Sequence, residues 1–137
     1  MTGKLRPIAV ALLRHGNKLL AMKGYDKVKD EVFYRLLGGG IEFGETSRET
    51  IQREFMEELA VEVEVQERLD VEENIFTFNG KQGHEIVFLY NAKFKDKSLY
   101  EKTDFDFVEE GKTTETVGWV KINDDAIIYP EIAKKYL

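Results

Sequence analysis

Apolar residues occur along the chain mostly in short runs that are separated by turn residues. The runs Ile8–Leu13 and Lys18–Lys23 flank a turn, "RHGN", and this pattern is typical of a β-hairpin. A further run, Glu31–Leu37, predicts a third strand that three consecutive glycines end. The N-terminal part therefore predicts a β-sheet.

The stretch Thr46–Ala60 has helical periodicity instead. Ile51, Phe55 and Leu59 are four positions apart, so they form one apolar stripe along a helix. The threonine that starts the stretch is followed three residues later by a glutamate, which matches a capping box. We expect this helix to pack its stripe against a sheet.

The C-terminal half continues with alternating or apolar runs. We expect strands at Val61–Val65, Asn74–Phe78, Glu85–Phe94 and Thr116–Ile122, a polar loop at Val108–Glu115, and a short amphipathic helix at Asp124–Leu137 that is interrupted near Pro130. Together the elements predict an α+β fold, a mixed β-sheet in an αβα sandwich, within a single domain over residues 1–137.

Composition limits the function classes. The 137 residues are 42% hydrophobic and 34% charged, as in ordinary globular domains. The absence of cysteine excludes disulfides, thiolate metal sites and a cysteine nucleophile, and it agrees with a cytoplasmic location. No stretch approaches the roughly 18 apolar residues of a membrane span, and the apolar run near the N-terminus indicates a strand rather than a signal peptide.

The formal net charge of −6 disfavours long nucleic acids as partners, because phosphate contacts need clustered Lys and Arg. A phosphorylated small molecule remains compatible with this charge when a divalent cation mediates the contact.

Three glutamates of the predicted helix share one face. At 100° per residue, Glu54, Glu57 and Glu58 lie at about 0°, 300° and 40° around the helix axis. Hard oxygen ligands suit Mg²⁺ or Mn²⁺ rather than zinc. The alternative interpretation is a solvated acidic face, which is what most charge runs are.

The glycines before the helix support a ligand site. Gly38, Gly39 and Gly40 allow the backbone to approach a bound phosphate closely, and a carbonyl there can complete a metal shell. Arg35, just before these glycines, is a candidate phosphate contact. Arg53, beside the acidic edge, is placed to hold a carboxylate.

The stretch Gly39–Val61 resembles the Nudix box, whose pattern is Gly-x5-Glu-x7-Arg-Glu-U-x-Glu-Glu-x-Gly-U with U a bulky apolar residue. The fixed positions are filled here by Gly39, Glu45, Arg53, Glu54, Phe55, Glu57, Glu58 and Val61. Ala60 stands where the family has Gly. Since that Gly would end the helix, the departure affects the turn and leaves the carboxylates in place.

The resemblance implies a Nudix fold and Mg²⁺- or Mn²⁺-dependent hydrolysis of a nucleoside diphosphate that is linked to another moiety. It implies that Glu54, Glu57, Glu58 and the carbonyl of Gly38 bind the metal.

The resemblance also implies that Arg53 orients a glutamate and that Glu45 assists through the helix or water network. Glu54 is our first choice as general base. Family members often draw a further carboxylate from outside the box. The candidates are Glu85 and, in the polar loop, Glu109, Glu110 and Glu115; we favour the loop.

The sequence says less about the substrate than about the reaction. A Pro about fifteen residues after the box resembles the ADP-ribose type, but Phe76 and Thr77 stand there. A Tyr at a similar distance suggests the dinucleoside polyphosphate type, and none is found there. The chain is more similar to small nucleoside triphosphate pyrophosphohydrolases.

Two alternatives stay open: a Nudix-fold nucleotide-binding or regulatory module without turnover, and an unrelated acidic domain that binds divalent cations. Metal-dependent turnover separates the hydrolase from both. A homodimer is compatible with the resemblance, although nothing in the sequence marks its interface.

Overall fold

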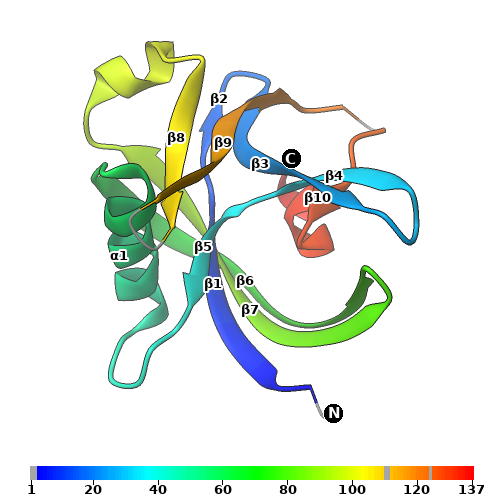
Figure 1. The fold of residues 1–137 in the computed structure, drawn as a ribbon. Coiled ribbons are helices and arrows are strands. Elements are labelled where there is room, and N and C mark those ends of the chain that lie inside the picture. The colour runs from blue at the N-terminus through cyan, green and yellow to red at the C-terminus, as the bar shows by residue number, and fades with distance from the viewer. Residues whose placement is uncertain (1–2, 110–111, 124) are drawn as a thin grey trace.

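The computed structural model describes residues 3–109, 112–123 and 125–137, and only the backbone at 109 and 112–115. Two β-sheets lie against each other, with α1 beside one end of them and a C-terminal turn of helix on the opposite side (Figure 1). The strands are β1 Leu5–Leu12, β2 Arg14–His15, β3 Lys18–Asp26, β4 Glu31–Arg35, β5 Leu37–Gly40, β6 Val63–Phe78, β7 Lys81–Phe94, β8 Asp104–Glu109, β9 Lys112–Lys121 and β10 Ile128–Tyr129. The helices are α1 Ser47–Leu59 and the 3-10 helices η1 Lys97–Glu101 and η2 Glu131–Tyr136.

Both sheets are mixed, and the predicted α+β class is confirmed. The first sheet has the strand order β5-β1-β7-β6, in which β1 and β7 are parallel. The second has the order β10-β4-β3-β9-β8, with β2 also paired to β3. None of the helices within the described ranges is long and apolar enough to cross a membrane.

The predicted hairpin between Ile8–Leu13 and Lys18–Lys23 forms only next to its turn. β2 folds back on β3, and Leu20 N donates to Leu13 O at 2.9 Å, but β1 lies in the other sheet. β1 is buried continuously from Ile8 to Leu12, so it needs a partner strand on each edge, and β5 and β7 supply them. The predicted strand Glu31–Leu37 is likewise divided at Leu36 between the two sheets.

The two strands predicted at Val61–Val65 and Asn74–Phe78 form one strand, β6. The charged stretch between them stays paired with β7 through two irregularities in register. β6 can carry these charges because it is the edge strand of its sheet and many of its side chains are exposed.

The helix predicted at Asp124–Leu137 is also wrong over most of its length. Asp124 lies outside the described residues. β10 pairs in parallel with β4, with backbone hydrogen bonds of 2.8 Å from Tyr34 N to Ile127 O and 3.0 Å from Leu36 N to Tyr129 O. The open edge of β4 therefore takes up this segment, and only η2 is helical.

α1 begins and ends as its sequence predicts. Thr46 Oγ1 accepts a hydrogen bond from Glu49 N at 3.1 Å, and Glu49 Oε1 accepts one from Thr46 N at 3.0 Å, which completes the capping box. Ala60 closes the helix in the left-handed conformation, with φ 57° and ψ 38°. Ile51 and Phe55 are buried in the core against both sheets. The helix is thereby fixed with its acidic edge toward β5.

Candidate active site

Arg53 of α1 donates hydrogen bonds to three carboxylates of the predicted site. Its Nε and Nη2 donate to both oxygens of Glu45, at 2.7 and 3.0 Å. Its Nη1 donates to Glu54 Oε1 at 2.9 Å and to Glu57 Oε2 at 3.3 Å. Nη2 also donates to the carbonyl oxygen of Gly40 at 3.1 Å. One guanidinium therefore joins the helix, the loop before it and β5.

The Glu45 carboxylate is held ionised by its partners. The bidentate hydrogen bond from Arg53 lowers the pKa of Glu45 from an ordinary 4.5 to about 2, and a hydrogen bond from Thr50 adds to this. Glu45 in turn raises the pKa of Arg53 above its ordinary value. The pair is a fixed ionic support at neutral pH.

Thr50 is a polar side chain that is fully buried. Its hydroxyl lies 2.7 Å from Glu45 Oε1 and 3.0 Å from the carbonyl oxygen of Thr46, and the carboxylate is the stronger acceptor. Thr50 thus holds the same oxygen of Glu45, Oε1, that accepts from Arg53 Nη2. The helix periodicity alone gives no reason to single out this threonine.

Gly38 and Gly39 lie where neighbouring atoms leave no space for a side chain. A Cβ at Gly39 would lie 2.5 Å from Glu54 Oε1, so the carboxylate rests against the glycine backbone. A Cβ at Gly38, where φ is +150°, would lie 2.0 Å from the carbonyl oxygen of Ala9 on β1. Gly39 therefore makes room for Glu54, and Gly38 for the neighbouring strand.

The predicted metal ligands share one side of α1, with the Glu54 side chain 15% exposed and that of Glu57 60% exposed. Glu58 is half-buried. Within the described part of the chain, no three acidic or histidine side chains already converge on one point. The donors are nevertheless all carboxylate or carbonyl oxygens beside a glycine backbone, which is the chemistry that Mg²⁺ and Mn²⁺ accept.

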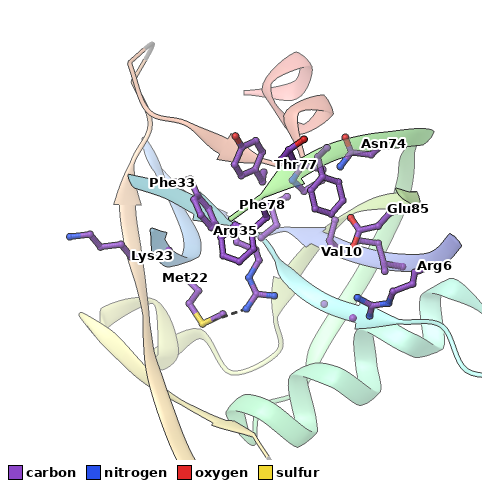
Figure 2. A pocket seen from close by; sticks show the side chains of 18 of the residues that line it. Arg6, Val10, Met22, Lys23, Phe33, Arg35, Asn74, Thr77, Phe78 and Glu85 are labelled. Carbon is purple, nitrogen blue, oxygen red and sulfur yellow. Dashed lines mark hydrogen bonds between the residues drawn. The ribbon is translucent and has the colours of Figure 1, made fainter. Parts of the chain in front are cut away.

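A cleft of about 500 Å³ opens between the two sheets, next to this cluster (Figure 2). Gly38 and Gly39 line it, so it reaches the glutamate helix. Its apolar lining comes from Ile8, Val10, Met22, Phe33, Leu36, Phe76, Phe78 and Pro130, and its polar lining from Arg6, Lys23, Arg35, Asn74, Thr77 and Glu85.

Three polar residues of the cleft lie side by side on adjacent strands. Glu85 on β7 is in register with Arg6 on β1 and with Asn74 on β6. Burial raises the pKa of Glu85, and the charges of Arg6 and Arg35 together with a hydrogen bond from Asn74 oppose that rise. A Cβ at Gly40 would lie 3.4 Å from Arg6 Nη2, so this guanidinium extends toward the glutamate cluster.

Aromatic rings form the other part of the cleft. Phe33 contacts Phe78 edge-on, with centroids 5.7 Å apart, and Tyr129 at 5.1 Å. The Phe33 ring covers Gly24 on the neighbouring strand, where a Cβ would lie 2.4 Å from it. This wall offers flat, apolar surface to a ring-shaped ligand.

The remaining candidates are placed as follows. Arg35 lines the cleft, and its Nη2 lies 3.8 Å from Met22 Sδ. The polar loop predicted at Val108–Glu115 is wrong where the structure describes it, because Glu109 and Glu115 belong to the paired strands β8 and β9. Glu110 and the side chains of Glu109 and Glu115 lie outside what the structure describes.

Sequence reasoning missed Arg6, Thr50 and Asn74. Each is a single polar residue inside an otherwise regular element. Only the register across β1, β7 and β6 makes Arg6 and Asn74 neighbours of Glu85.

The NUDIX domain family matches residues 4–131, which is nearly the whole chain. The chain belongs to the Nudix family. The predicted family is thereby confirmed, and with it the enzyme class, a Nudix hydrolase, whose members act on pyrophosphate linkages.

Solved structures share this Nudix fold. A MutT NUDIX hydrolase from Burkholderia pseudomallei superposes with a TM-score of 0.66 at 20% identity, over 96% of this chain and 97% of that one. A NUDIX hydrolase from Nitrosomonas europaea gives 0.65 at 15% identity, over 96% and 85%. A UDP-X diphosphatase gives 0.60 at 21% identity, over 94% of this chain and 57% of that one. At these identities the likeness concerns the fold alone.

Proposed function

We propose that this Nudix protein hydrolyses a diphosphate linkage in a nucleoside di- or triphosphate derivative with the help of Mg²⁺ or Mn²⁺. The observation that carries the proposal is the Arg53 network, which joins Glu45, Glu54 and Glu57 to the carbonyl of Gly40, while Glu54 lies against Gly39, which also lines the cleft. Gly39 thus borders both the proposed catalytic carboxylates and a cleft of substrate size.

In this proposal, one set of residues holds the cation and another positions the group that takes a proton. Glu54, Glu57, Glu58 and the carbonyl of Gly38 would hold the cation. When bound, the cation neutralises phosphate charge and lowers the pKa of water. Arg53 donates to Glu54 Oε1, Glu45 accepts from Arg53, and Thr50 donates to Glu45. Glu54 is then oriented to take the proton from the attacking water.

The cleft supplies substrate binding. Its basic residues, Arg6 and Arg35, attract phosphate, and the Phe33 wall accepts a flat base. A nucleoside triphosphate of ordinary size suits both features. The names of solved neighbours, which include a UDP-X diphosphatase and a MutT protein, show that the fold itself does not choose the substrate.

The second candidate is a nucleotide-binding module without turnover. The retained Glu54, Glu57 and Glu58 argue against it, since a module that only binds has no need of an oriented carboxylate set.

The test is release of phosphate and pyrophosphate with Mg²⁺ and then Mn²⁺. The panel holds standard and oxidised nucleoside triphosphates, ADP-ribose, nucleotide sugars and dinucleoside polyphosphates. A Glu57→Gln/Glu58→Gln variant is compared with Glu72→Gln/Glu73→Gln, the same change on exposed residues of β6.

We expect metal-dependent turnover that only the first variant loses, by at least about 100-fold in kcat. Folded, metal-binding wild-type protein that turns over none of the panel would contradict the hydrolase and favour the binding module.

A further inference from the structure

We propose that Glu85, which lies in register between Arg6 and Asn74, is a specificity-determining hydrogen-bond acceptor for a donor group on the nucleoside part of the substrate. The donor is a ribose hydroxyl or a base N–H. The inference rests on the proposed function and adds which feature of the nucleotide the cleft recognises.

The first step is position. Glu85 sits in the middle of three adjacent strands, in register with Arg6 on one side and Asn74 on the other. All three residues line the cleft, and Figure 2 shows them together, across the cavity from Phe33. Asn74 and Arg6 lie on either side of Glu85, so the half-buried Glu85 presents an acceptor to a ligand between two polar neighbours.

The second step is charge. An ionised carboxylate can only accept hydrogen bonds, and it repels phosphate. Burial raises the pKa of Glu85, and the charges of Arg6 and Arg35 oppose that rise. The phosphates of a ligand therefore favour the Gly38–Gly40 side of the cleft, and a group that faces Glu85 must donate.

The third step is distance from the metal carboxylates. Gly39 pairs with Ala9, which pairs with Phe88, three residues beyond Glu85 on β7. Two strand spacings and three residues along a strand separate the backbones of Gly39 and Glu85 by about 14 Å. Because oxygen ligands lie only about 2.0–2.1 Å from Mg²⁺, Glu85 is too distant to share the cation that Glu54 would bind at Gly39.

The consequence is discrimination between nucleotides that differ in one donor. A site built around a polar partner rejects an analogue that lacks the matching group, because the partner is then left unpaired. The carboxylate of Glu85 would be such a partner, since Asn74 and Arg6 do not saturate an acceptor with about four lone-pair directions.

The experiment uses pairs of ligands that differ in one donor. GTP with dGTP tests the ribose hydroxyl; GTP with ITP, and ATP with purine riboside triphosphate, test an exocyclic amino group. We measure kcat/KM with Mg²⁺ for each pair, and we measure binding of the α,β-methylene analogues of the same nucleotides by calorimetry. Binding and turnover are thus read separately.

We expect wild-type protein to favour the donor-bearing member of at least one pair by about tenfold. Glu85→Gln should remove that preference. Glu73→Gln, the same change at an exposed position beside Asn74, should keep the wild-type preference. Asn74→Leu should reduce it, because Glu85 loses its fixing partner.

Two outcomes would overturn the inference while leaving the hydrolase intact: a preference that survives Glu85→Gln, and wild-type turnover with no preference in any pair. Loss of kcat on every nucleotide in Glu85→Gln, with binding unchanged, would also overturn it and assign Glu85 to the chemistry. Selective binding without any turnover would instead contradict the proposed function and support the inference.

Discussion

The glutamate cluster and the cleft meet at Gly39, yet they are assembled in opposite ways. The contacts of Arg53 fall between Gly40 and Glu57, at the end of β5, in the loop after it and in α1. The cleft draws its lining from Arg6 to Pro130, across seven strands of both sheets. The cluster depends on short-range charge and the cleft on long-range register, so changes in the first should alter kcat and changes in the second should alter KM.

The largest predicted loss of activity is at Gly39, the residue that both lines the cleft and lies against Glu54. Gly39→Ala places a Cβ 2.5 Å from Glu54 Oε1 and displaces that carboxylate. Because misplacement by about 1 Å can cost 10²-fold in rate, we expect kcat to fall about 100-fold with KM nearly unchanged. Steady-state kinetics check this.

Gly40→Ala is the matched control, since its Cβ would meet Arg6 Nη2 at a tolerable 3.4 Å. Equal losses in both variants would mean that the glycine strand as a whole, rather than the Glu54 contact, limits turnover.

The next effect concerns the cleft alone. Arg6→Gln removes a cation from the cleft lining. A charge-assisted hydrogen bond contributes about 1.5–3 kcal/mol, so we expect KM to rise at least about tenfold while kcat changes little. Inhibition by pyrophosphate should weaken in parallel. A fall in kcat without a change in KM would break the proposed division between the two regions.

Thr50 tests whether the cluster is stabilised as a unit. Thr50→Val keeps the shape and removes the hydroxyl that contacts Glu45, so the free energy of unfolding should fall by about 1–2 kcal/mol in urea titrations. In a Glu45→Gln background the same change should cost less, because the charged acceptor is gone. Strict additivity in this double-mutant cycle would show that the two side chains do not support each other.

The smallest effect is a pH dependence. Because folding lowers the pKa of Glu45 from 4.5 to about 2, the unfolded chain takes up this proton first as the pH falls. The stabilisation from Glu45 is therefore complete above about pH 5 and is lost between there and about pH 2. Melting temperatures of wild type and Glu45→Gln should converge over this window. A constant difference would mean that the carboxylate charge does not contribute.

The same contrast explains what the sequence can predict. The cluster follows from spacing along one helix, so Arg53, Glu54 and the capping box lie where the pattern predicts them. The strands also occur near most of the apolar runs. Their partners were not predictable, because a run such as Ile8–Leu13 does not say which two strands will cover it.

Other errors have similar causes. The segment after Asp124 has helical periodicity, but the unpaired edge of β4 offers it backbone hydrogen bonds. Arg6 and Asn74 lie 68 positions apart in the chain, and they gain meaning only through their common neighbour, Glu85. The residues of the glutamate cluster lie close together in the sequence, whereas the residues of the cleft come together only when the sheets assemble.

Leu36 lies between two candidate substrate contacts. At this buried residue a single extended run passes from one sheet to the other, with Arg35 in the cleft just before it and Gly38 just after. Arg35 and Gly38 are only three residues apart, so the packing of Leu36 fixes the spacing between a candidate phosphate contact and a candidate metal contact.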